Sequence, residues 1–495
     1  MNDNETWFSH WPKVSLKNLG WLLTICFIGM TFIPRSFDNI LFMDGLAYAA
    51  ISRNMAFGQG SFWEPHFADS FWLPFNNCAF FCEHPPLMFG IESVLFKILG
   101  DTTAVENIYN TIILLASMWL ICRLWQKLFA SRHEISDQGW LPVLLWYGLR
   151  IVWWSIPNNL LDSTMAVFCL SSCYVQLTAL SSAKFRPAYW FIAGLMIVFA
   201  CMTKGPVGIY PLAFSAIYVL VYGKAFLKTA VPGTIIILVT FLLLMFFILQ
   251  YPPADYFLKN YFQGQVMAAL LQKREKVSND WTAHFYLLRL LLTNIFPHLV
   301  LLSALLMANS YYKLGSKISA GVRKVPLLTC VVTASVVLPM LASVKQGDHY
   351  LLPALPFVGL FFAACTVELI LPLTCKFPSA TRISFLVLSS VSVVLMTYRL
   401  INPEKDHMFD ISKKLSAYVP PHAKIYLPAR ISKSPEIHTT FQRYSRLSIA
   451  YHPEDTKYLF FDDSRDIVLD SIRKTNAYQI IDLGVNARLA IHNQE

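Results

Sequence analysis

Carboxylates and cations lie beside the apolar segments of this sequence, and their types suit the transfer of a group from a phosphate-linked donor. The carboxylates are Asp44, Glu83 and Asp162, and the cations are Lys204 and Lys345. An acceptor hydroxyl needs one general base, which a carboxylate can supply. A departing phosphate needs stabilisation by positive charge rather than protonation. We therefore predict Asp44 as the general base, with Glu83 as the competing candidate.

Other polar side chains occur in the same few segments. The stretch "MTKGPVG" adds a predicted helix start at Pro206, whose backbone N–H groups could help to bind a phosphate. Lysine, histidine and tyrosine side chains can also donate hydrogen bonds to phosphate oxygens. The remaining candidates come from "FCEHPPLMFG", from the end of a long loop and from "VKQGDHYLLP", and they are His84, His284, Asp348 and His349.

Each of these residues alone has an ordinary structural explanation. A lysine at the end of a membrane helix often extends its ammonium group to the interface. An aspartate in a turn often caps a helix. Together, however, these residues are harder to explain by structure alone, because ionisable groups at membrane depth are costly and usually functional. Here they come from six separate segments that share one predicted face, so we interpret them as a site.

Two other kinds of chemistry stay open but have less support from the spacing. Glu83, His84, His284 and His349 are acceptable ligands for a divalent metal such as zinc, but no HExxH or Cys/His spacing accompanies them. A hydrolase would need paired carboxylates or a nucleophile with its base. The sequence has no G-x-S-x-G motif. We therefore expect no certain cofactor and keep a divalent metal as an alternative.

The composition is that of a polytopic membrane protein. Of the 495 residues, 55% are hydrophobic and 14% are charged, whereas soluble domains carry roughly 25% charged residues. The mean hydropathy is +0.47. A net charge of +10 is also typical of proteins that bind nucleic acid, but here the basic residues are spread between long apolar runs. We therefore expect contact with membrane lipid and no nucleic-acid partner.

Apolar runs of membrane-spanning length predict about eleven crossings. A shorter apolar stretch, 87–99, predicts an interfacial helix instead. Few charges lie in the middles of the spans, and Arg150 and Arg289 are exceptions. The spans show no internal repeat of the kind found in many transporters. The predicted spans are 19–37, 107–123, 141–157, 163–182, 189–203, 206–223, 230–250, 286–307, 326–344, 351–372 and 384–401.

Lysine and arginine are concentrated in alternate loops, and this bias predicts the orientation. The N-terminus is expected in the cytoplasm, and the long loops 38–106 and 251–285 and the tail after residue 401 are expected outside. Residues 7–20 are polar and aromatic, so the first span is expected to remain as an anchor rather than a cleaved signal peptide. The basic side chains of the predicted inner loops are Lys13, Lys17, Arg123, Lys127, Arg132, Lys184, Arg186, Lys224, Lys228, Lys313, Lys317, Arg323, Lys324, Lys376 and Arg382.

The tail, 402–495, changes character. Its stretches "AKIYLPA", "RLSIAYH" and "KYLFFDD" predict strands, and "SRDIVLDSIRKT" predicts a helix between strands. The expected fold is therefore an all-α polytopic membrane domain over 1–401 with a small soluble α/β domain over 402–495. The tail shows no catalytic motif. In the first outer loop, Cys78 and Cys82 could form a disulfide in an oxidising compartment, but the sequence leaves their pairing open.

An ordered series of motifs resembles a known family. The stretch "FMDGLAYAAISRNMAFGQGSFWEP" resembles the first outer-loop signature of C-superfamily (GT-C) membrane glycosyltransferases. The branch it resembles contains the protein O-mannosyltransferases and the lipid A aminoarabinose transferases. That signature has an acidic pair, a Tyr-Ala-rich helix, an arginine and a Gly-x-Trp-like stretch. The positions that match it are Asp44, Tyr48, Ala49, Arg53 and Gly60–Trp63.

Four later motifs continue the series as far as residue 356. "EHPPL" is similar to the family's Glu-Lys-Pro-Pro element, and "LLDSTMAVF" resembles its Asp-bearing turn. "MTKGPVGIYP" is similar to its Thr-Lys-Gly-Pro element, and "VKQGDHYLLPALP" to its Lys…Tyr-x-x-Pro element. Two positions depart from the pattern. Gly45 replaces the second acid of the pair, and His84 replaces a lysine, so residue 84 could contact a phosphate only when protonated or by donating one N–H when neutral.

The resemblance implies a bacterial inner-membrane enzyme that moves a sugar from a polyprenyl-phosphate carrier to an acceptor on the outer face. The acceptor would be lipid A, a glycan or a protein, and a single displacement would invert the anomeric centre. A rival reading is a transporter or flippase that binds an anionic lipid-linked sugar with the same cations. A third reading is a structural membrane protein, against which the gathered polar residues argue. The sequence identifies neither the sugar nor the acceptor.

Overall fold

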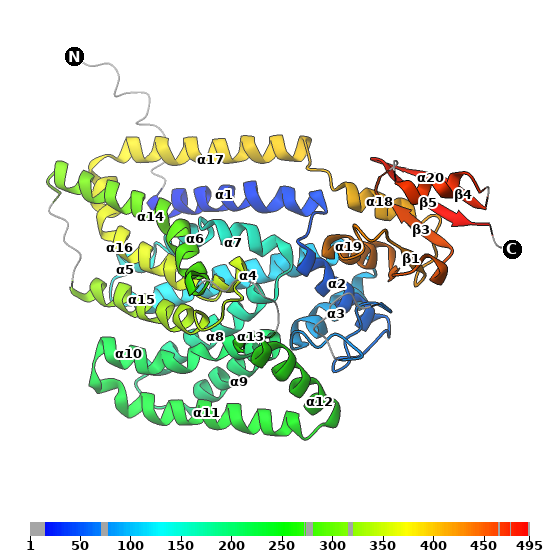
Figure 1. Ribbon diagram of the computed structural model, residues 1–495. Helices are drawn as coiled ribbons and strands as arrows, with labels where there is room; N and C mark the ends of the chain where they lie inside the picture. The colour runs from blue at the N-terminus through cyan, green and yellow to red at the C-terminus, as the bar shows by residue number, and fades with distance from the viewer. Residues whose placement is uncertain are drawn as a thin grey trace, which may run out of the picture.

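A bundle of long helices with a small sheet at one end makes up the protein (Figure 1). The computed structural model describes residues 15–70, 78–271, 273, 281–314, 320–463, 466–475 and 477–493. Lys13 and Lys317, which contributed to the predicted orientation, lie outside the described residues. The same is true of parts of the two long outer loops and of a few positions in the tail.

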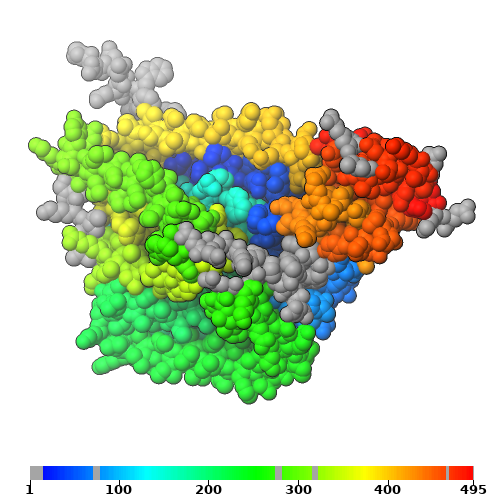
Figure 2. All heavy atoms as spheres, in the orientation of Figure 1, coloured from blue at the N-terminus to red at the C-terminus, as the bar shows by residue number. Residues whose placement is uncertain are grey.

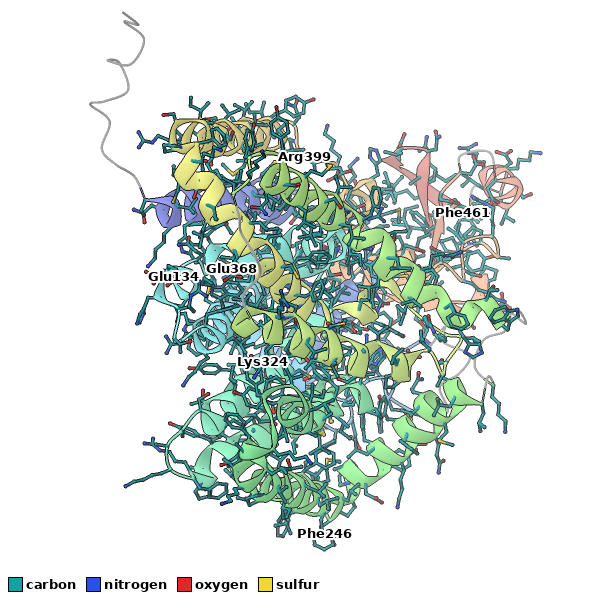
Figure 3. All side chains as sticks on the ribbon, turned by 90° about the vertical axis from the view of Figure 1, so that its left-hand side faces the viewer. Glu134, Phe246, Lys324, Glu368, Arg399 and Phe461 are labelled. Carbon is teal, nitrogen blue, oxygen red and sulfur yellow. A yellow bond between two sulfur atoms is a disulfide. The ribbon has the colours of Figure 1, made fainter. Side chains whose placement is uncertain are left out.

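Nine helices within the described residues are long and apolar enough to cross a membrane. Their exposed side chains are largely apolar. Phe246, for example, points away from the bundle (Figure 3) and is 57% exposed, as expected where lipid replaces water. The nine helices are α1 (Leu16–Asp38), α4 (Ala104–Leu128), α8 (Leu161–Leu180), α9 (Pro187–Lys204), α11 (Leu227–Leu249), α14 (Tyr286–Tyr311), α15 (Ala320–Met340), α16 (Leu355–Lys376) and α17 (Pro378–Ile401).

The other two predicted spans are built from shorter pieces. The span predicted at 141–157 breaks at Gly148 into α6 (Trp140–Tyr147) and α7 (Arg150–Ser155), followed by η2 (Ile156–Asn158). The span predicted at 206–223 consists of η3 (Pro206–Ala213) and α10 (Phe214–Tyr222). Glycine and proline interrupt regular helix hydrogen bonding in both places, which hydropathy alone does not register.

Side chains of α14 supply hydrogen-bond partners for backbone groups at the break between α6 and α7. The side-chain oxygen of Asn294 accepts a hydrogen bond from the Ile151 N–H at 3.2 Å. His298 Nε2 donates to the Leu145 carbonyl at 2.8 Å. A broken helix inside a membrane needs such partners, because lipid offers no hydrogen bonds to the freed backbone groups. The two side chains therefore fix α14 against both α6 and α7.

Short helices connect the spans. Those at the same end of the bundle as the sheet include α2 (Met43–Ala56), α3 (Leu87–Leu99) and α12 (Pro252–Tyr261) (Figure 1). Helix α3 has the bounds predicted for the interfacial helix. The remaining short helices are α5 (His133–Ser136), η4 (Lys224–Phe226), the π-helix η5 (Phe262–Met267), α13 (Ala268–Leu270), η6 (Trp281–Phe285) and η7 (Asp348–Leu351).

The tail folds into a five-stranded sheet in the order β2-β1-β3-β5-β4. Strand β1 is parallel to β2 and β3, whereas β5 is antiparallel to β3 and β4. Its elements are α18 (His407–Leu415), β1 (Lys424–Tyr426), α19 (Pro435–Ser445), β2 (Ser448–Ala450), η8 (Pro453–Asp455), β3 (Tyr458–Phe461), α20 (Ile467–Arg473), β4 (Tyr478–Gly484) and β5 (Ala487–His492). The three strands and the helix predicted from the sequence are all present.

Alternation along the central strand β3 explains why both faces of the sheet are covered. Phe460 packs with Phe441 of α19 on one face, and Phe461 packs with Leu469 of α20 on the other. Successive side chains of a strand point to opposite faces, so an uninterrupted apolar strand needs a helix on each side. The tail thus has its own apolar core and places α19 next to α2.

Candidate active site

Helix α2 carries Asp44 in its first turn, and its start is fixed by a distant asparagine. Asn158 Oδ1 accepts a hydrogen bond from the Phe42 N–H at 2.8 Å. A Cβ atom on Gly45 would lie 2.0 Å from the Asn158 carbonyl oxygen. No second acidic side chain therefore fits beside Asp44 while α2 and η2 pack in this way. This contact accounts for the departure from the family's acidic pair.

Asp162 is the centre of a buried cluster of charges. It lies in the first turn of α8 and is 2% exposed. Its Oδ2 atom is ion-paired with Lys204 Nζ, and His349 Nε2 lies 3.7 Å from the same oxygen. Its Oδ1 atom is buried and has no hydrogen-bond partner among the described residues. The cluster therefore retains an open acceptor for a ligand.

Lys204 ends α9 at a turn that α12 holds in place. Gly205 has φ +87°, and a Cβ there would lie 1.9 Å from the Tyr261 hydroxyl oxygen. That hydroxyl donates to the Lys204 carbonyl at 3.1 Å. The Lys204 ammonium lies 4.4 Å from the centre of the Tyr350 ring. The ammonium is thus oriented by Asp162 and Tyr350, while its backbone is fixed from the other side.

The charges of this cluster act on the Asp44 carboxyl. Burial raises the pKa of the Asp44 carboxyl, and the charges of His349, Lys204 and Lys345 oppose that rise. Asp162 adds to the rise because it carries the same charge. Within the part of the chain that the structure describes, the Asp44 carboxylate makes no hydrogen bond or ion pair. A half-buried carboxylate without a partner can accept a proton from a ligand.

His349 supplies a neutral donor rather than a charge. Burial lowers the pKa of His349, and the Lys204 ammonium lowers it further, although Asp162 and Asp44 oppose both effects. The ring is therefore mainly uncharged near pH 7 and carries one N–H. It lies edge-on to Tyr350, with ring centres 5.0 Å apart.

Tyr48 connects the cluster to the predicted Glu83–His84 pair. Burial raises the pKa of Tyr48 well above its usual range, and the charges of Asp44, Asp162 and Glu83 add to the rise. The His84 ring packs edge-on against Tyr48 at 5.8 Å between ring centres. The adjacent Glu83 is 8% exposed. Cys82, the residue before it, forms a disulfide with Cys78.

An apolar groove of about 430 Å³ opens beside Lys204. It is lined by α9, η3, α11, α12, the start of η5 and Pro85. Four of its lining residues have polar side chains, and these are Asp255, Lys259, Tyr261 and Gln263. The other lining residues include Gly205, Pro206, Phe241, Met245 and Leu249. An apolar chain in this groove would bring a polar headgroup to the end of α9.

The comparisons with known proteins agree on the architecture. The family model for dolichyl-phosphate-mannose-protein mannosyltransferases matches residues 83–250. A curated relative, undecaprenyl phosphate-alpha-4-amino-4-deoxy-L-arabinose arabinosyl transferase 2 of Proteus mirabilis, is 25% identical over 294 residues. That match spans 58% of this chain and 49% of the relative, about half its length.

Two solved structures resemble the whole molecule. ArnT from Cupriavidus metallidurans bound to undecaprenyl phosphate is 12% identical, with a TM-score of 0.65 over 96% of this chain and 98% of that chain. The chain has the GT-C fold. The oligosaccharyltransferase of Archaeoglobus fulgidus is also similar, with 12% identity and a TM-score of 0.51 over 89% of this chain and 68% of that chain. The predicted resemblance in fold is confirmed.

The GT-C fold brings most of the predicted site residues together but not all. Arg53 lies at the far end of α2 from Asp44 and donates to the carbonyls of Gln442 and Arg443 in α19. His284 donates from Nδ1 to the Leu341 carbonyl at 2.7 Å. Arg53 therefore holds the tail, and His284 anchors the start of α14 to the loop after α15.

No three His, Cys, Asp or Glu side chains gather as metal ligands among the described residues. Sequence reasoning also overlooked two residues that shape the site, Asn158 and Tyr261. The Asn-Asn pair before "LLDS" was a usable signal, because asparagine commonly caps turns. Tyr261 offered no such signal, since its partner lies 57 positions away.

Proposed function

We propose that this protein is a membrane glycosyltransferase that transfers a sugar from a polyprenyl-phosphate carrier to an acceptor. The single observation that carries the proposal is that the Asp44 carboxylate makes no hydrogen bond or ion pair within the described residues, while the charges of the paired Lys204 and Asp162 both act on it. The base and the cation would then act on the two ends of one displacement. The groove beside Lys204 supports a lipid-linked donor.

The chemistry would proceed as one in-line displacement. Asp44 accepts the proton of the acceptor hydroxyl while that oxygen forms a bond to the anomeric carbon of the sugar. The bond from that carbon to the carrier phosphate breaks, and the phosphate leaves with the electron pair. Lys204 and Lys345 stabilise the charge on the leaving phosphate, and His349 donates a hydrogen bond to it. The anomeric centre is inverted.

The remaining predicted residues have supporting roles. Asp162 orients Lys204 through one carboxylate oxygen, and its other oxygen could accept a hydrogen bond from a sugar hydroxyl. Tyr48 and Tyr350 offer ring faces and hydroxyl groups to the sugar. Glu83 orients the loop over α2 and stays the competing base. The divalent metal that Glu83, His84 and His284 could hold stays a prediction, tested by activity in excess chelator.

The donor class is supported by the relatives. The Proteus mirabilis relative is named for undecaprenyl phosphate and for arabinosyl transfer. We propose an undecaprenyl-phosphate sugar of the pentose type, with a hexose as the alternative. The assay uses purified protein with such a donor, and turnover releases free carrier phosphate. Movement of the intact donor across vesicles without release would instead support a flippase.

The proposed location is the bacterial inner membrane, with the N-terminus in the cytoplasm and the tail outside. This orientation would place the Asp44 cluster on the outer side. It is supported by the distribution of basic residues between loops. A cysteine introduced into the tail should react with an impermeant thiol reagent in intact spheroplasts. Labelling only after lysis would reverse the orientation.

A further inference from the structure

Glu92 is a buried acidic side chain that the proposed mechanism does not use. It belongs to α3 and is fully buried. Its Oε1 atom accepts a hydrogen bond from Asn159 Nδ2 at 2.9 Å. Its Oε2 atom is also buried and has no hydrogen-bond partner among the described residues. Burying a carboxyl group is costly unless its contacts compensate, so the contact with Asn159 is the place to look for its role.

Asn159 connects Glu92 to the turn that carries the proposed base. The residue follows η2 with φ +55° and is fully buried. Its Nδ2 atom also donates to the Gly45 carbonyl at 3.4 Å, and Gly45 follows Asp44 in the first turn of α2. Its Oδ1 atom has no partner within the described part of the chain. Two acceptors therefore orient the Asn159 amide, and the shorter contact is the one to Glu92.

The segment around Asn159 is fixed from other helices as well. Asn110 of α4 donates from Nδ2 to the Pro157 carbonyl at 3.0 Å. The neighbouring Asn158 holds the start of α2 through the Phe42 N–H, as described above. Glu92 adds the contact from α3. The segment leads directly into Asp162, three positions after Asn159, so these bonds position both proposed carboxylates of the site.

Helix α3 is itself held by the tail. Phe96 lies one turn after Glu92, and the centre of its ring is 5.1 Å from the Arg443 guanidinium. Arg443 is also ion-paired with Glu106 of α4. Figure 2 shows the orange start of the tail against the blue segment that contains α2 and α3. A side chain of α3 can position another residue because α3 is fixed on this side.

Glu92 is suited to act as an uncharged acceptor. Burial raises the pKa of Glu92 to about 8, and the charge of Glu106 contributes to the rise. Hydrogen bonds from Ser52 and Asn159 and the charge of Arg443 oppose it. The carboxyl group is therefore mainly protonated near pH 7. Glutamine has nearly the same shape, is uncharged and keeps the Oε1 acceptor, so it is the conservative substitute.

We propose that Glu92 is a positioning residue for sugar transfer, which acts through Asn159 on the Gly45 carbonyl and thereby on the placement of Asp44. The assignment rests on the proposed function, in which Asp44 is the base. A base must lie within hydrogen-bond reach of the acceptor proton, and a displacement of about 1 Å can cost about a hundredfold in rate. Glu92 itself touches neither the substrates nor the reacting atoms.

The first experiment is a double-mutant cycle on transfer. Glu92→Leu removes the acceptor, and Asn159→Gly removes the amide while keeping a residue that adopts positive φ. Each should lower kcat by about ten- to a hundredfold with the donor KM near its wild-type value, and the double variant should be no slower than the slower single variant. Glu92→Gln should retain most of kcat. Ser93→Ala is the matched control, because it removes a hydrogen bond within α3, from Ser93 Oγ to the Gly90 carbonyl at 2.7 Å.

Three outcomes of the cycle would overturn the proposal. Losses that add in the double variant would mean that Glu92 does not act through Asn159. Equal losses in Glu92→Gln and Glu92→Leu would mean that the acceptor atom is not what matters. A loss of the same size in Ser93→Ala would reduce the effect to the stability of α3. If Glu92→Leu does not fold, Asn159→Gly tests the same contact from its other side, and an unchanged kcat there overturns the proposal.

A second measurement does not depend on activity. Hydrogen–deuterium exchange of the purified protein without substrates should be faster at residues 42–46 in Glu92→Leu than in the wild type, Glu92→Gln or Ser93→Ala. The Leu46 N–H donates to the Phe42 carbonyl at 3.1 Å, so its exchange reports on the first turn of α2. Faster exchange in a protein that transfers no sugar would support the contact and contradict only the proposed function. Unchanged exchange together with unchanged kcat would overturn the role of Glu92.

Discussion

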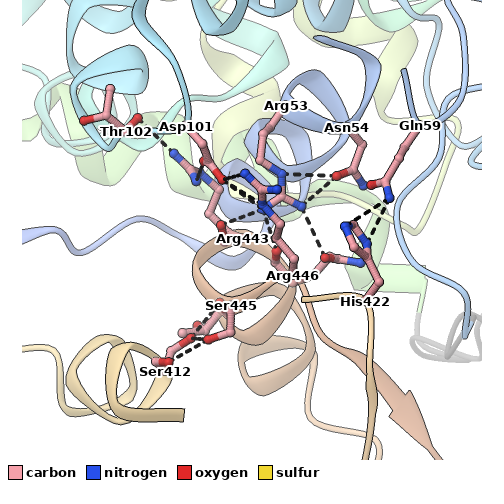
Figure 4. A network of polar contacts seen from close by, with 12 residues as sticks. Arg53, Asn54, Gln59, Asp101, Thr102, Ser412, His422, Arg443, Ser445 and Arg446 are labelled. Atoms are coloured by element: carbon pink, nitrogen blue, oxygen red, sulfur yellow. Dashed lines mark hydrogen bonds and ion pairs between the residues drawn. The ribbon is translucent and has the colours of Figure 1, made fainter. Parts of the chain in front are cut away.

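Helix α2 takes part in two buried charge networks, one at each end, and they differ in how completely they are paired. At its start, the charges of Asp162, Lys204 and His349 act on the Asp44 carboxyl. At its end, Arg53 joins Arg443 and Arg446 of the tail (Figure 4). Both networks include residues of one helix of 14 residues, so the same helix can be compared at its two ends.

The network at the end of α2, the arginine clamp, uses nearly all of its donors. Arg443 Nε donates to Glu106 at 2.5 Å and Nη1 to Asp101 at 2.7 Å. Arg446 donates twice to the other oxygen of Asp101, at 3.0 and 2.8 Å. Arg53 donates to two carbonyls of α19, at 2.9 Å each. Three segments far apart in the chain are held together by these contacts.

The pKa values reflect this pairing. Burial would lower the pKa of Arg443, but Glu106 and Asp101 outweigh burial and raise it. Burial would raise the pKa of Asp101, but Arg443 and Arg53 outweigh it and lower the pKa. At the other end of α2, the pKa of Asp44 is raised, because its cationic neighbours do not compensate for its burial. A paired network stabilises the docked tail, whereas an incompletely paired one keeps groups available for a ligand.

The largest expected effect comes from removing the base. Asp44→Asn keeps the shape of the side chain and removes its basicity, so transfer should fall by roughly 10²–10⁴-fold. Donor binding and thermal stability should stay near those of the wild type, because Asp44 has no described partner to lose. The measurement is single-turnover transfer with saturating donor.

Glu83→Gln is the matched comparison for Asp44→Asn. It should reduce transfer far less, since Glu83 lies in the loop over α2 rather than in the cluster. Near-normal turnover in Asp44→Asn together with lost turnover in Glu83→Gln would assign the base to Glu83.

Breaking the arginine clamp should have the next largest effect, but on stability. Arg443→Gln leaves the Glu106 carboxylate buried and unpaired, which should cost about 3–5 kcal/mol of unfolding free energy. The unfolding midpoint in detergent should fall accordingly. Adding Glu106→Gln to the same chain should recover much of the loss, because the unpaired charge is then removed. A single variant as stable as the wild type would show that the clamp is dispensable.

A smaller effect is expected from the phosphate-binding cations. Lys345→Gln should remove one charge-assisted contact worth about 1.5–3 kcal/mol and weaken undecaprenyl phosphate binding by roughly ten- to a hundredfold. Lys204→Gln also leaves Asp162 unpaired, so it is tested with and without Asp162→Asn. Donor affinity that stays unchanged in all three variants would reduce both lysines to structural residues.

The smallest effect is a shift in pH dependence. Asp44 must be ionised to act, so activity should rise with pH through the pKa of Asp44. Lys345 lowers that pKa, and Lys345→Gln should therefore move the acidic limb of kcat to higher pH. Asp162 raises it, so Asp162→Asn should move the limb to lower pH. Shifts in the same direction in both variants would mean that another group controls the limb.

Local signals in the sequence were sufficient for the architecture. The length of an apolar run reports directly on bilayer thickness, so nine of the predicted spans are continuous helices. Alternating apolar residues in the tail predicted its strands for the same kind of reason, since a strand repeats every two residues. The site candidates at helix ends were also visible, because an ionisable group next to an apolar run has few reasons to be there.

Tertiary structure decided which of these candidates meet. Arg53 and Asp44 belong to the same motif, yet Arg53 binds residues 389 and 390 positions away and has no contact with the cluster. Gly45 is explained only by the Asn158 carbonyl, and the hydrogen-bond partners of the backbone around the break at Gly148 are visible only in the side chains of α14. Such contacts depend on how distant segments pack in three dimensions. Helix propensity and hydropathy act over one turn or one bilayer thickness, so they specify the elements and leave their partners to the fold.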